Sequence, residues 1–208
     1  MNKNYKSNTV QKWLRLVLSA VCLAAFLLVN LPHTKAQVGN LPILFYTQRE
    51  GDGLRSYGMN VDGSNQTRIG DRGFFARYSP DGTKIVFVTS VPDVNTPFGR
   101  RQQIFVMNVD GTNPINISND PMHHHNAPAW FPDGRIAFIS FGLDYSGGDL
   151  WMMNADGSNR QSIYFSQNPG GAWYPSVSPD STKIAFSDYD ASGDIEVYVI
   201  NADGSNLR

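Results

Sequence analysis

The sequence predicts an all-β chain made of repeated four-stranded antiparallel units, arranged as the blades of a β-propeller. Two turn motifs recur along the chain, and a short apolar strand follows one of them each time. The first motif reads Asn-x-Asp-Gly-Ser/Thr-Asn. Its four copies directly follow Met59, Met107, Met153 and Ile200, and the steps between copies are 48, 46 and 47 residues. A period of about 40 to 50 residues is typical of one supersecondary unit copied in tandem, and four short strands per period describe a propeller blade.

Residues 1–36 are predicted to be a secretory signal peptide that precedes the fold. A basic segment is followed by an apolar run over residues 16–29, and Thr34 and Ala36 are small residues at the −3 and −1 positions of a cleavage site before Gln37. These are the three parts of a signal peptide. An uncleaved membrane anchor is the alternative, although the run is shorter than the about 20 apolar residues of a spanning helix. The single cysteine, Cys22, lies in this leader, so we expect an exported domain that is stable without disulfides.

The charge balance changes when the leader is removed. The chain has 17 Lys and Arg against 18 Asp and Glu, and five of the basic residues but none of the acidic ones lie in residues 1–36. The remainder therefore has 12 basic and 18 acidic residues, a net charge of −6. This balance argues against a nucleic-acid partner, which requires a basic surface. No transmembrane segment is expected after cleavage.

The strands of each unit are designated a, b, c and d from the propeller axis outward. Strand c carries an aromatic residue five positions before each turn aspartate, namely Tyr57, Phe105, Trp151 and Tyr198. Asp-Gly between alternating apolar residues predicts a hairpin, because the turn needs a positive φ and glycine supplies it without steric cost. Each copy of the first motif is therefore predicted to join strand c to strand d.

A second turn recurs out of phase with the first, as Ser79-Pro-Asp-Gly82, Phe131-Pro-Asp-Gly134 and Ser178-Pro-Asp-Ser181. Proline presets φ for the first turn position, and Asp-Gly completes the reversal. Because Ser181 replaces glycine, that turn must tolerate an ordinary residue or be slightly strained. Apolar strands follow over residues 84–88, 135–139 and 183–187, and residues 43–45 are a fourth copy. Apolar residues on both faces predict interior strands.

The residues Trp130-Phe-Pro-Asp-Gly-Arg-Ile-Ala-Phe138 and Leu150-Trp-Met-Met-Asn-Ala-Asp-Gly-Ser-Asn159 resemble the WD40-like Pro-Asp repeat of TolB-type propellers. The resemblance covers nearly all of residues 41–208. It implies a propeller that binds a protein or another ligand in the cell envelope. TolB proper has an α/β domain ahead of its propeller, whereas the first strand is expected here about five residues after the leader.

The predicted propeller occupies residues 37–208, with blades at about 41–69, 73–118, 126–164 and 172–208. The first unit has strands b, c and d, the second and third have all four, and the fourth has a, b and c. About 3.5 blades are therefore expected, as a truncated part of a larger six- to eight-bladed propeller, since natural examples have about 4 to 8 blades. A complete four-bladed ring, or a ring closed by two chains, are the alternatives.

The connections between strands b and c, and between d and the next a, share one end of the predicted propeller and differ among blades. Blade two carries about six extra residues at 91–101. Loops on a rigid scaffold often carry function. Arg100 and Arg101 in this insertion could clamp a carboxylate or phosphate, but a solvated loop tip is the expected arrangement because no second basic cluster accompanies them.

Two further segments at this end have a metal-like composition. His123, His124 and His125 are consecutive, so their rings alternate in direction in an extended chain, and an exposed polar loop is expected rather than a metal site. Asp188, Asp190, Ser192 and Gly193 imitate a calcium loop, and Asp194 follows them, but Val199 replaces the bidentate glutamate. The similar residues 144–149 of blade three indicate an ordinary hairpin turn. We therefore assign no metal or cofactor site.

No catalytic motif is present: the sequence has no Gly-x-Ser-x-Gly elbow, no His-Glu-x-x-His and no P-loop. The expected function is a non-catalytic propeller, periplasmic or extracellular, that binds a protein or peptide through its variable end. The alternative is the N-terminal propeller of a prolyl-oligopeptidase-like serine peptidase. A propeller lyase that uses the histidine loop and a metal is a third class. The oligomeric state is not indicated.

Overall fold

The computed structural model describes residues 43–49, 53–60, 62–64, 66–68 and 73–208. These residues belong to one compact unit, Val38–Arg208. The predicted leader, residues 1–36, lies outside the described residues, so its assignment as a signal peptide stays a prediction. The described residues contain no helix with the length and hydrophobicity needed to cross a membrane.

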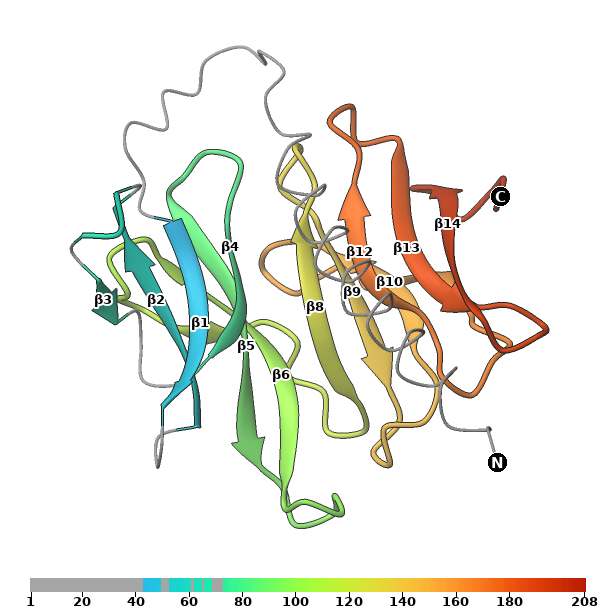
Figure 1. Cartoon of the computed structure of the whole chain (residues 1–208), viewed down its shortest axis with the longest axis horizontal. Helices are drawn as coiled ribbons and strands as arrows, with labels where there is room; N and C mark the ends of the chain where they lie inside the picture. The colour runs from blue at the N-terminus through green and yellow to red at the C-terminus, as the bar shows by residue number, and fades with distance from the viewer. Residues whose placement is uncertain (1–42, 50–52, 61, 65, 69–72) are drawn as a thin grey trace, which may run out of the picture. The chain divides into compact units, whose positions relative to one another are not determined.

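The described residues form four antiparallel sheets that follow one another in chain order (Figure 1). The sheets comprise, in turn, β1 (Ile43–Arg49), β2 (Gly53–Met59) and β3 (Thr67–Arg68); β4 (Phe74–Tyr78), β5 (Lys84–Pro92), β6 (Arg100–Asn108) and β7 (Ile115–Asn116); β8 (His124–Trp130), β9 (Ile136–Phe141), β10 (Asp149–Met153) and β11 (Gln161–Tyr164); and β12 (Trp173–Val177), β13 (Lys183–Tyr189) and β14 (Ile195–Asn201).

Each sheet is one propeller blade with the strand order predicted from the sequence. The first blade shows strands b to d, the second and third show a to d, and the fourth shows a to c. Consecutive blades meet through β1, β4, β8 and β12. At the outer edge of β14, Arg208 exchanges two backbone hydrogen bonds of 2.9 Å with Val199. The predicted fold class, a partial all-β propeller, is confirmed.

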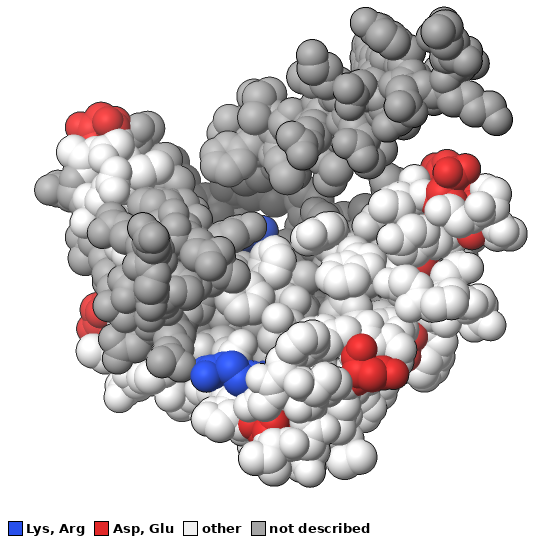
Figure 2. Space-filling view, turned by 60° about the horizontal axis from the view of Figure 1, so that its bottom comes forward, with Lys and Arg blue, Asp and Glu red and all other residues white. Residues whose placement is uncertain are grey.

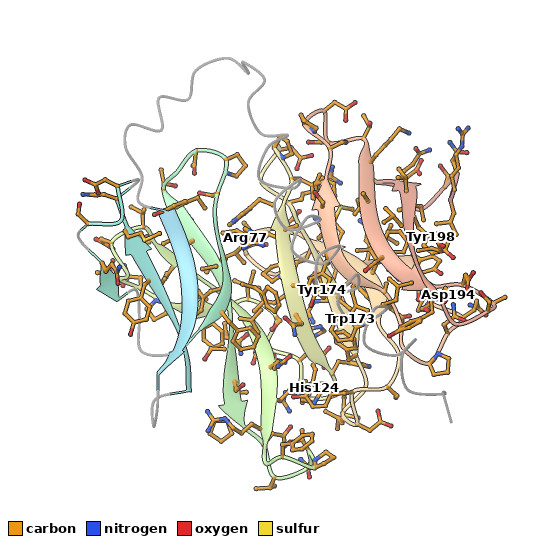
Figure 3. All side chains as sticks on the ribbon, in the orientation of Figure 1. Arg77, His124, Trp173, Tyr174, Asp194 and Tyr198 are labelled. Atoms are coloured by element: carbon orange, nitrogen blue, oxygen red, sulfur yellow. The ribbon has the colours of Figure 1, made fainter. Side chains whose placement is uncertain are left out.

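In the second, third and fourth blades, the innermost strand contains a β-bulge at the same position. The bulges contain Phe75, Ala127 and Tyr174, whose φ angles are 53°, 48° and 52°. Positive φ is uncommon for residues other than glycine, and a bulge locally bends a strand and increases its twist. The ring centroids of Phe75 and Tyr174 lie 6.2 Å apart, although β8 separates their strands in the chain. The bulges therefore direct these two side chains toward one another (Figure 3 labels Tyr174).

Strand b of the inner blades is buried on both faces, as the sequence predicted. All six residues of β9 are buried, and so are residues 85–88 of β5. One core cluster, which includes Phe138 and Ile104, lies between the second and third blades, and another, which includes Ile139 and Ile184, lies between the third and fourth. In β13, Ala185 and Ser187 are only half-buried, because among the described residues the fourth blade has a neighbouring sheet on one side.

The repeated Asn-x-Asp-Gly turn is stabilised by its own polar side chains. In blade three, Asp156 Oδ1 accepts hydrogen bonds from the Ser158 backbone NH (2.9 Å) and hydroxyl (2.6 Å), and Asn154 Nδ2 donates to the same hydroxyl (2.9 Å). These bonds favour the carboxylate and lower the pKa of Asp156. Gly157 has φ 85° and Ser181, in the other turn family, has φ 61°. The expected positive φ of the turn glycine is confirmed. Ser181, for which a tolerant turn type and slight strain were the two alternatives, has a positive φ that is uncommon for a residue other than glycine.

The glycine of this turn also touches the preceding blade. A Cβ at Gly157 would lie 2.1 Å from the Ile117 carbonyl oxygen, just beyond β7, and a Cβ at Gly204 would lie 2.8 Å from the carbonyl oxygen of Ile163 in β11. Real Cβ atoms do not approach other atoms so closely, so both turns pack directly against backbone. The repeated motif thus joins consecutive blades as well as reversing the chain.

Replacing Gly157 with alanine tests this contact, with Gly111 as a matched control. Both glycines have φ 85°, but a Cβ at Gly111 meets no atom of the described residues within 4 Å. We expect Gly111→Ala to lower the free energy of unfolding by about 1–2 kcal/mol, the cost of a left-handed residue. Gly157→Ala should cost roughly 1–3 kcal/mol more because it overpacks the joint between blades. Urea unfolding followed by tryptophan fluorescence measures both, and equal losses would contradict the contact.

Candidate functional site

The connections that differ among blades lie at one end of the propeller. This is the end at which the chain turns from β5 to β6, at the bottom of Figure 1. We call this end the loop end; it comprises residues 93–99, 117–123, 142–148, 165–172 and 190–194. Figure 2 turns it toward the viewer and shows red acidic groups at several places on the described surface, with little blue. The opposite end carries the Asp-Gly and Pro-Asp turns.

The insertion of blade two is a compact loop with a buried polar centre. Asp93 and Thr96 are 8% and 6% exposed, although the loop projects beyond its sheet. Thr96 Oγ1 accepts a hydrogen bond from the Arg100 backbone NH (2.8 Å), and the Asp93 carboxylate accepts the backbone NH of Asn95 (3.0 Å). A backbone bond of 2.9 Å from Asp93 to Gly99 closes the loop. The loop therefore has a defined conformation.

Arg101 is not the solvated residue that the sequence suggested. Its guanidinium forms an ion pair with Asp93, and the two side chains are only 15% and 5% exposed. The same Nη1 donates to the carbonyl oxygen of Pro121 (3.0 Å), which ties the insertion to the next connection. Arg100 Nη2 donates to the carbonyl oxygen of Ser90 (2.8 Å). The expectation was wrong for Arg101 because the chain folds back and brings Asp93 to it, so the pair does not form a clamp for an outside anion.

His124 is also buried, against the expectation of an exposed loop. It is 0% exposed at the start of β8 (Figure 3). The backbone NH of Gln102 donates to Nδ1 (3.1 Å), so this nitrogen carries no proton, and Nε2 donates to the carbonyl oxygen of Leu143 (3.2 Å). Burial lowers the pKa of His124, which is consistent with a neutral ring. Both nitrogens are occupied, so His124 is neither a metal ligand nor a base.

His123 and His125 point to the other side of the strand, as the predicted alternation requires. Both reach the same oxygen of Asp120, with distances of 3.1 Å from His123 Nδ1 and 3.2 Å from His125 Nε2. Arg160 Nη1 lies 3.6 Å from that oxygen. The bond from His125 is the main reason why the pKa of Asp120 falls far below its usual range, although burial opposes the change.

The expected exposed loop is correct for His123, whose side chain is 50% exposed, and wrong for His125, which is 2% exposed. Burial lowers the pKa of His125 more than Asp120 raises it. His125 Nδ1 is buried without a hydrogen-bond partner in the described structure, and the ring meets Phe138 edge-on at 5.1 Å. His124 and His125 were misjudged together because β8 begins at His124, two residues earlier than the sequence suggested.

A row of polar residues crosses blade three beside this cluster. His125 pairs with Ser140, and Ser140 pairs with Asp149, so the three side chains lie on one face of the sheet. Burial raises the pKa of Asp149, and the charge of Asp188 adds to the rise. Asp120 and Asp149 therefore have opposite pKa shifts. No hydroxyl of the described residues bonds to His125 Nδ1, so the row lacks the bond from nucleophile to base that covalent catalysis uses.

The calcium-like segment is a hairpin turn. Asp190 Oδ1 accepts the Ser192 hydroxyl (2.7 Å) and the backbone NH groups of Ser192 and Asp194 (both 2.9 Å). Asp188 is buried on β13, where its carboxylate accepts the Tyr164 hydroxyl (2.9 Å). Asp144 makes the same turn bonds with Ser146. Nowhere in the described ranges do three or more His, Cys, Asp or Glu residues gather in a way that could hold a metal ion.

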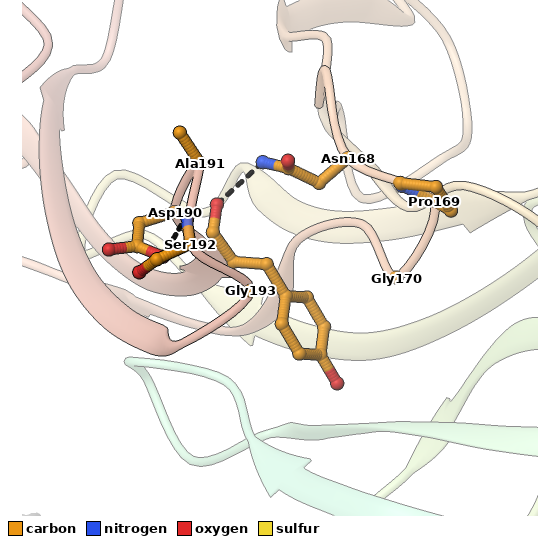
Figure 4. Close-up of a pocket in the computed structure, with 8 residues that line it drawn as sticks. Asn168, Pro169, Gly170, Asp190, Ala191, Ser192 and Gly193 are labelled. Atoms are coloured by element: carbon orange, nitrogen blue, oxygen red, sulfur yellow. Dashed lines mark hydrogen bonds between the residues drawn. The ribbon is translucent and has the colours of Figure 1, made fainter.

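An open cavity of about 450 Å³ lies between residues 168–170 and 189–193 (Figure 4). Asn168 Nδ2 donates to the Tyr189 carbonyl oxygen (2.5 Å), and the ring of Tyr189 lies against Gly170, where a Cβ would be 2.1 Å from the ring. The carboxylate on the cavity wall, Asp190, is engaged in its own turn. The Asn168 amide nitrogen and the Asp190 carboxylate on its wall are thus both engaged in bonds within the protein.

No family model matches the chain. A structure from Agrobacterium tumefaciens described as TolB superimposes with a TM-score of 0.66 at 21% sequence identity, over 79% of this chain and 59% of that one. The fold is that of a TolB-like β-propeller. A puromycin hydrolase structure also matches the TolB-like propeller, with a TM-score of 0.58 at 13% identity, over 84% of this chain and 31% of that one.

One curated protein shares detectable sequence. Dipeptidyl-peptidase 5 of Porphyromonas gingivalis is 39% identical over 110 residues, which are 52% of this chain and 15% of that protein. The chain therefore spans a minor part of this relative and about three-fifths of the Agrobacterium structure. The chain is thus similar in sequence to part of a dipeptidyl-peptidase and similar in fold to a TolB structure.

Sequence reasoning missed the carboxylates that organise the loop end. Asp93 was part of the recognised insertion, but its partner is eight residues away and no motif connects them. Asp120 lies three residues before His123 and five before His125, and this spacing could have suggested a shared contact. Asp149 could have been placed beside Ser140 and His125 only by aligning the strand registers of three strands.

Asp93→Asn tests whether the buried ion pair orders the insertion. The change leaves the buried guanidinium of Arg101 without its counter-charge, and we expect a loss of about 3 kcal/mol in unfolding free energy, as for a broken buried pair. Hydrogen exchange of peptides covering residues 92–101 should accelerate. Asp144→Asn on the exposed neighbouring turn is the control and should change neither quantity appreciably. Unchanged exchange in the Asp93 variant would contradict an ordering role.

The buried histidines should make the protein less stable in weak acid. Folded-state pKa values of His124 and His125 below the unfolded value of about 6.5 mean that the unfolded chain binds protons first. The contribution of these neutral rings to the free energy of unfolding is fully present above about pH 6.5. It is lost as the pH falls from about 6.5 toward the folded-state pKa values. Imidazole NMR should show both rings neutral at pH 6.5, each with its proton on Nε2. Titration of both rings near 6.5 would refute this assignment.

Proposed function

We propose that this chain is an exported, non-catalytic TolB-like propeller that binds a protein or peptide partner in the cell envelope through its loop end. The observation that carries the proposal is the contrast between the two ends. At the other end, the turn aspartates are occupied by their own serine and threonine neighbours, as at Asp156 and Asp180. At the loop end, the connections differ in length and composition from blade to blade.

The insertion of blade two supports the proposal. A buried ion pair and several hydrogen bonds hold residues 93–99 in one conformation, and a pre-ordered loop loses little entropy on binding. The leader composition supports export. The polar row at His125, Ser140 and Asp149 supports a binding scaffold better than an enzyme, since His125 has no hydroxyl partner.

A second candidate is the propeller of a serine peptidase, and the match to dipeptidyl-peptidase 5 favours it. In that case a hydrolase domain would accompany the propeller in the complete protein. The loop end would then control access to the peptidase instead of holding a partner. The two candidates differ in one readily measured property, the presence of a reactive serine.

Immunoprecipitation of the native protein from the cells that produce it distinguishes the two candidates. An antibody against residues 73–208 recovers it with whatever follows in the same chain, before and after reversible cross-linking of intact cells. We expect a cross-linked partner that is recovered reproducibly and no reaction with a fluorophosphonate probe, which labels activated serines. Probe labelling would establish the peptidase candidate, and recovery of the protein alone after cross-linking would reject the binding function.

A further inference from the structure

We infer that Val94, Phe98 and Tyr145 form a docking surface for an extended peptide segment that carries an apolar side chain next to a lysine or arginine. The inference rests on the proposed function and specifies its partner. The surface belongs to two neighbouring connections of the loop end, the insertion of blade two and residues 142–148 of blade three. We call it the Phe98 surface.

Its apolar part is unusually exposed. Val94 is 94% exposed and Phe98 is 74% exposed, and Met122, on the connection that Arg101 ties to the insertion, is 61% exposed. Burying such side chains against a partner favours binding, because it removes apolar surface from water. Isolated apolar residues on a surface need no explanation, but Val94 and Phe98 share one short loop and Phe98 also contacts Tyr145, so apolar groups are concentrated here.

The surface is supported from below by a stack of rings. Phe98 meets the ring of Tyr145 edge-on, with centroids 5.9 Å apart, and Tyr145 stacks on His124 at 3.8 Å. The bonds from Gln102 and to Leu143 fix the His124 ring. Tyr145 has φ 62°, a conformation uncommon for a bulky residue, and such strain often accompanies functional positions. The aromatic side chains are therefore positioned before any partner arrives.

The hydrogen bonds and the ion pair inside the insertion fix a conformation in which its apolar side chains are exposed to solvent. Asp93, Thr96 and Arg101 are turned inward and bonded, while Val94 and Phe98 between them are turned outward. A flexible loop would fold its phenylalanine onto the nearest apolar surface. A loop with this internal bonding presents an anchor residue at low entropic cost, which is the property of interface hot spots.

The charge around the surface selects a cationic partner. Asp144 adjoins Tyr145 and is exposed, and hydrogen bonds from Ser146 lower its pKa, so it stays ionised. On the corresponding connection of the next blade, Asp194 is exposed and Asp190 is half-buried. Arg101 is neutralised by Asp93, and the guanidinium of Arg100 is directed at the backbone of β5. An anionic lipid or phosphate would meet this acidity, whereas a lysine or arginine beside an apolar residue complements it.

Selection from a random dodecapeptide phage library on the full chain tests the inference. We expect enriched sequences to pair an apolar residue with Lys or Arg. Fluorescence anisotropy with one such synthetic peptide should show affinity falling about 10-fold or more in Phe98→Ser, the loss of an anchor residue. In Asp144→Asn the fall should be about 3-fold, with a weaker dependence on salt. Ile115→Ser, which changes a 62% exposed residue at the other end, is the matched control and should bind as wild type.

Several results would overturn the inference. Selected peptides without a cationic residue, or with affinity unchanged in Phe98→Ser while thermal unfolding shows a folded variant, would reject the Phe98 surface as a peptide site. Binding of the wild-type protein, but not of Phe98→Ser, to phosphatidylglycerol vesicles would also reject the peptide site, because the surface would then bind a membrane. Any of these leaves the proposed function intact if cross-linking in cells recovers a partner. Peptide binding at Phe98 without a partner in cells would instead reject the proposed function alone.

Discussion

The structure depends on how closely the backbone of one blade approaches the next. The glycine of each described turn in blades three and four lies against a carbonyl of the preceding blade, Gly157 at Ile117 and Gly204 at Ile163. No side chain fits there, so the turn must contain glycine for two independent reasons, its positive φ and its contact. In these two blades the contact adds to the positive φ, which all four turn glycines share, as a reason for the Asn-x-Asp-Gly phrase to keep its glycine. The uniform end holds the blades together and leaves the other end open to variation.

Much of the fold could be predicted from the sequence because its signals are local. The Asp-Gly and Pro-Asp turns and the apolar triplets each lie within a few residues, and together they give the strands, their order and the buried position of Phe138. The bulges at Phe75, Ala127 and Tyr174 were not predicted, since no glycine marks them. They follow from the geometry of strands packed around a common axis. That packing becomes visible only when several blades are assembled.

The loop end was only partly predictable, and the failures share one cause. The insertion was recognised from its length, but Arg101 and His124 were expected in solvent and lie buried against Asp93 and Gln102. These contacts form between residues separated by 8 and 22 positions. Composition alone makes such segments look like solvated polar loops. Their burial shows that the loop end is a constructed surface, in which polar residues serve as internal supports and a few apolar residues face outward.

Repetition of the turn also repeats its chemistry. Asp62, Asp110, Asp156 and Asp203 occupy the same position in successive blades, and in each the hydroxyl and backbone NH of the residue two positions later lower the carboxyl pKa. Each carboxylate contributes its stabilisation above about pH 4, the usual range for aspartate, and loses it as the pH falls toward the lowered value. In all four turns the carboxyl pKa is shifted in the same direction by the same kind of neighbour. Repeating one turn in successive blades therefore also repeats its sensitivity to strong acid, so protonation weakens every copy of the turn rather than one weak point.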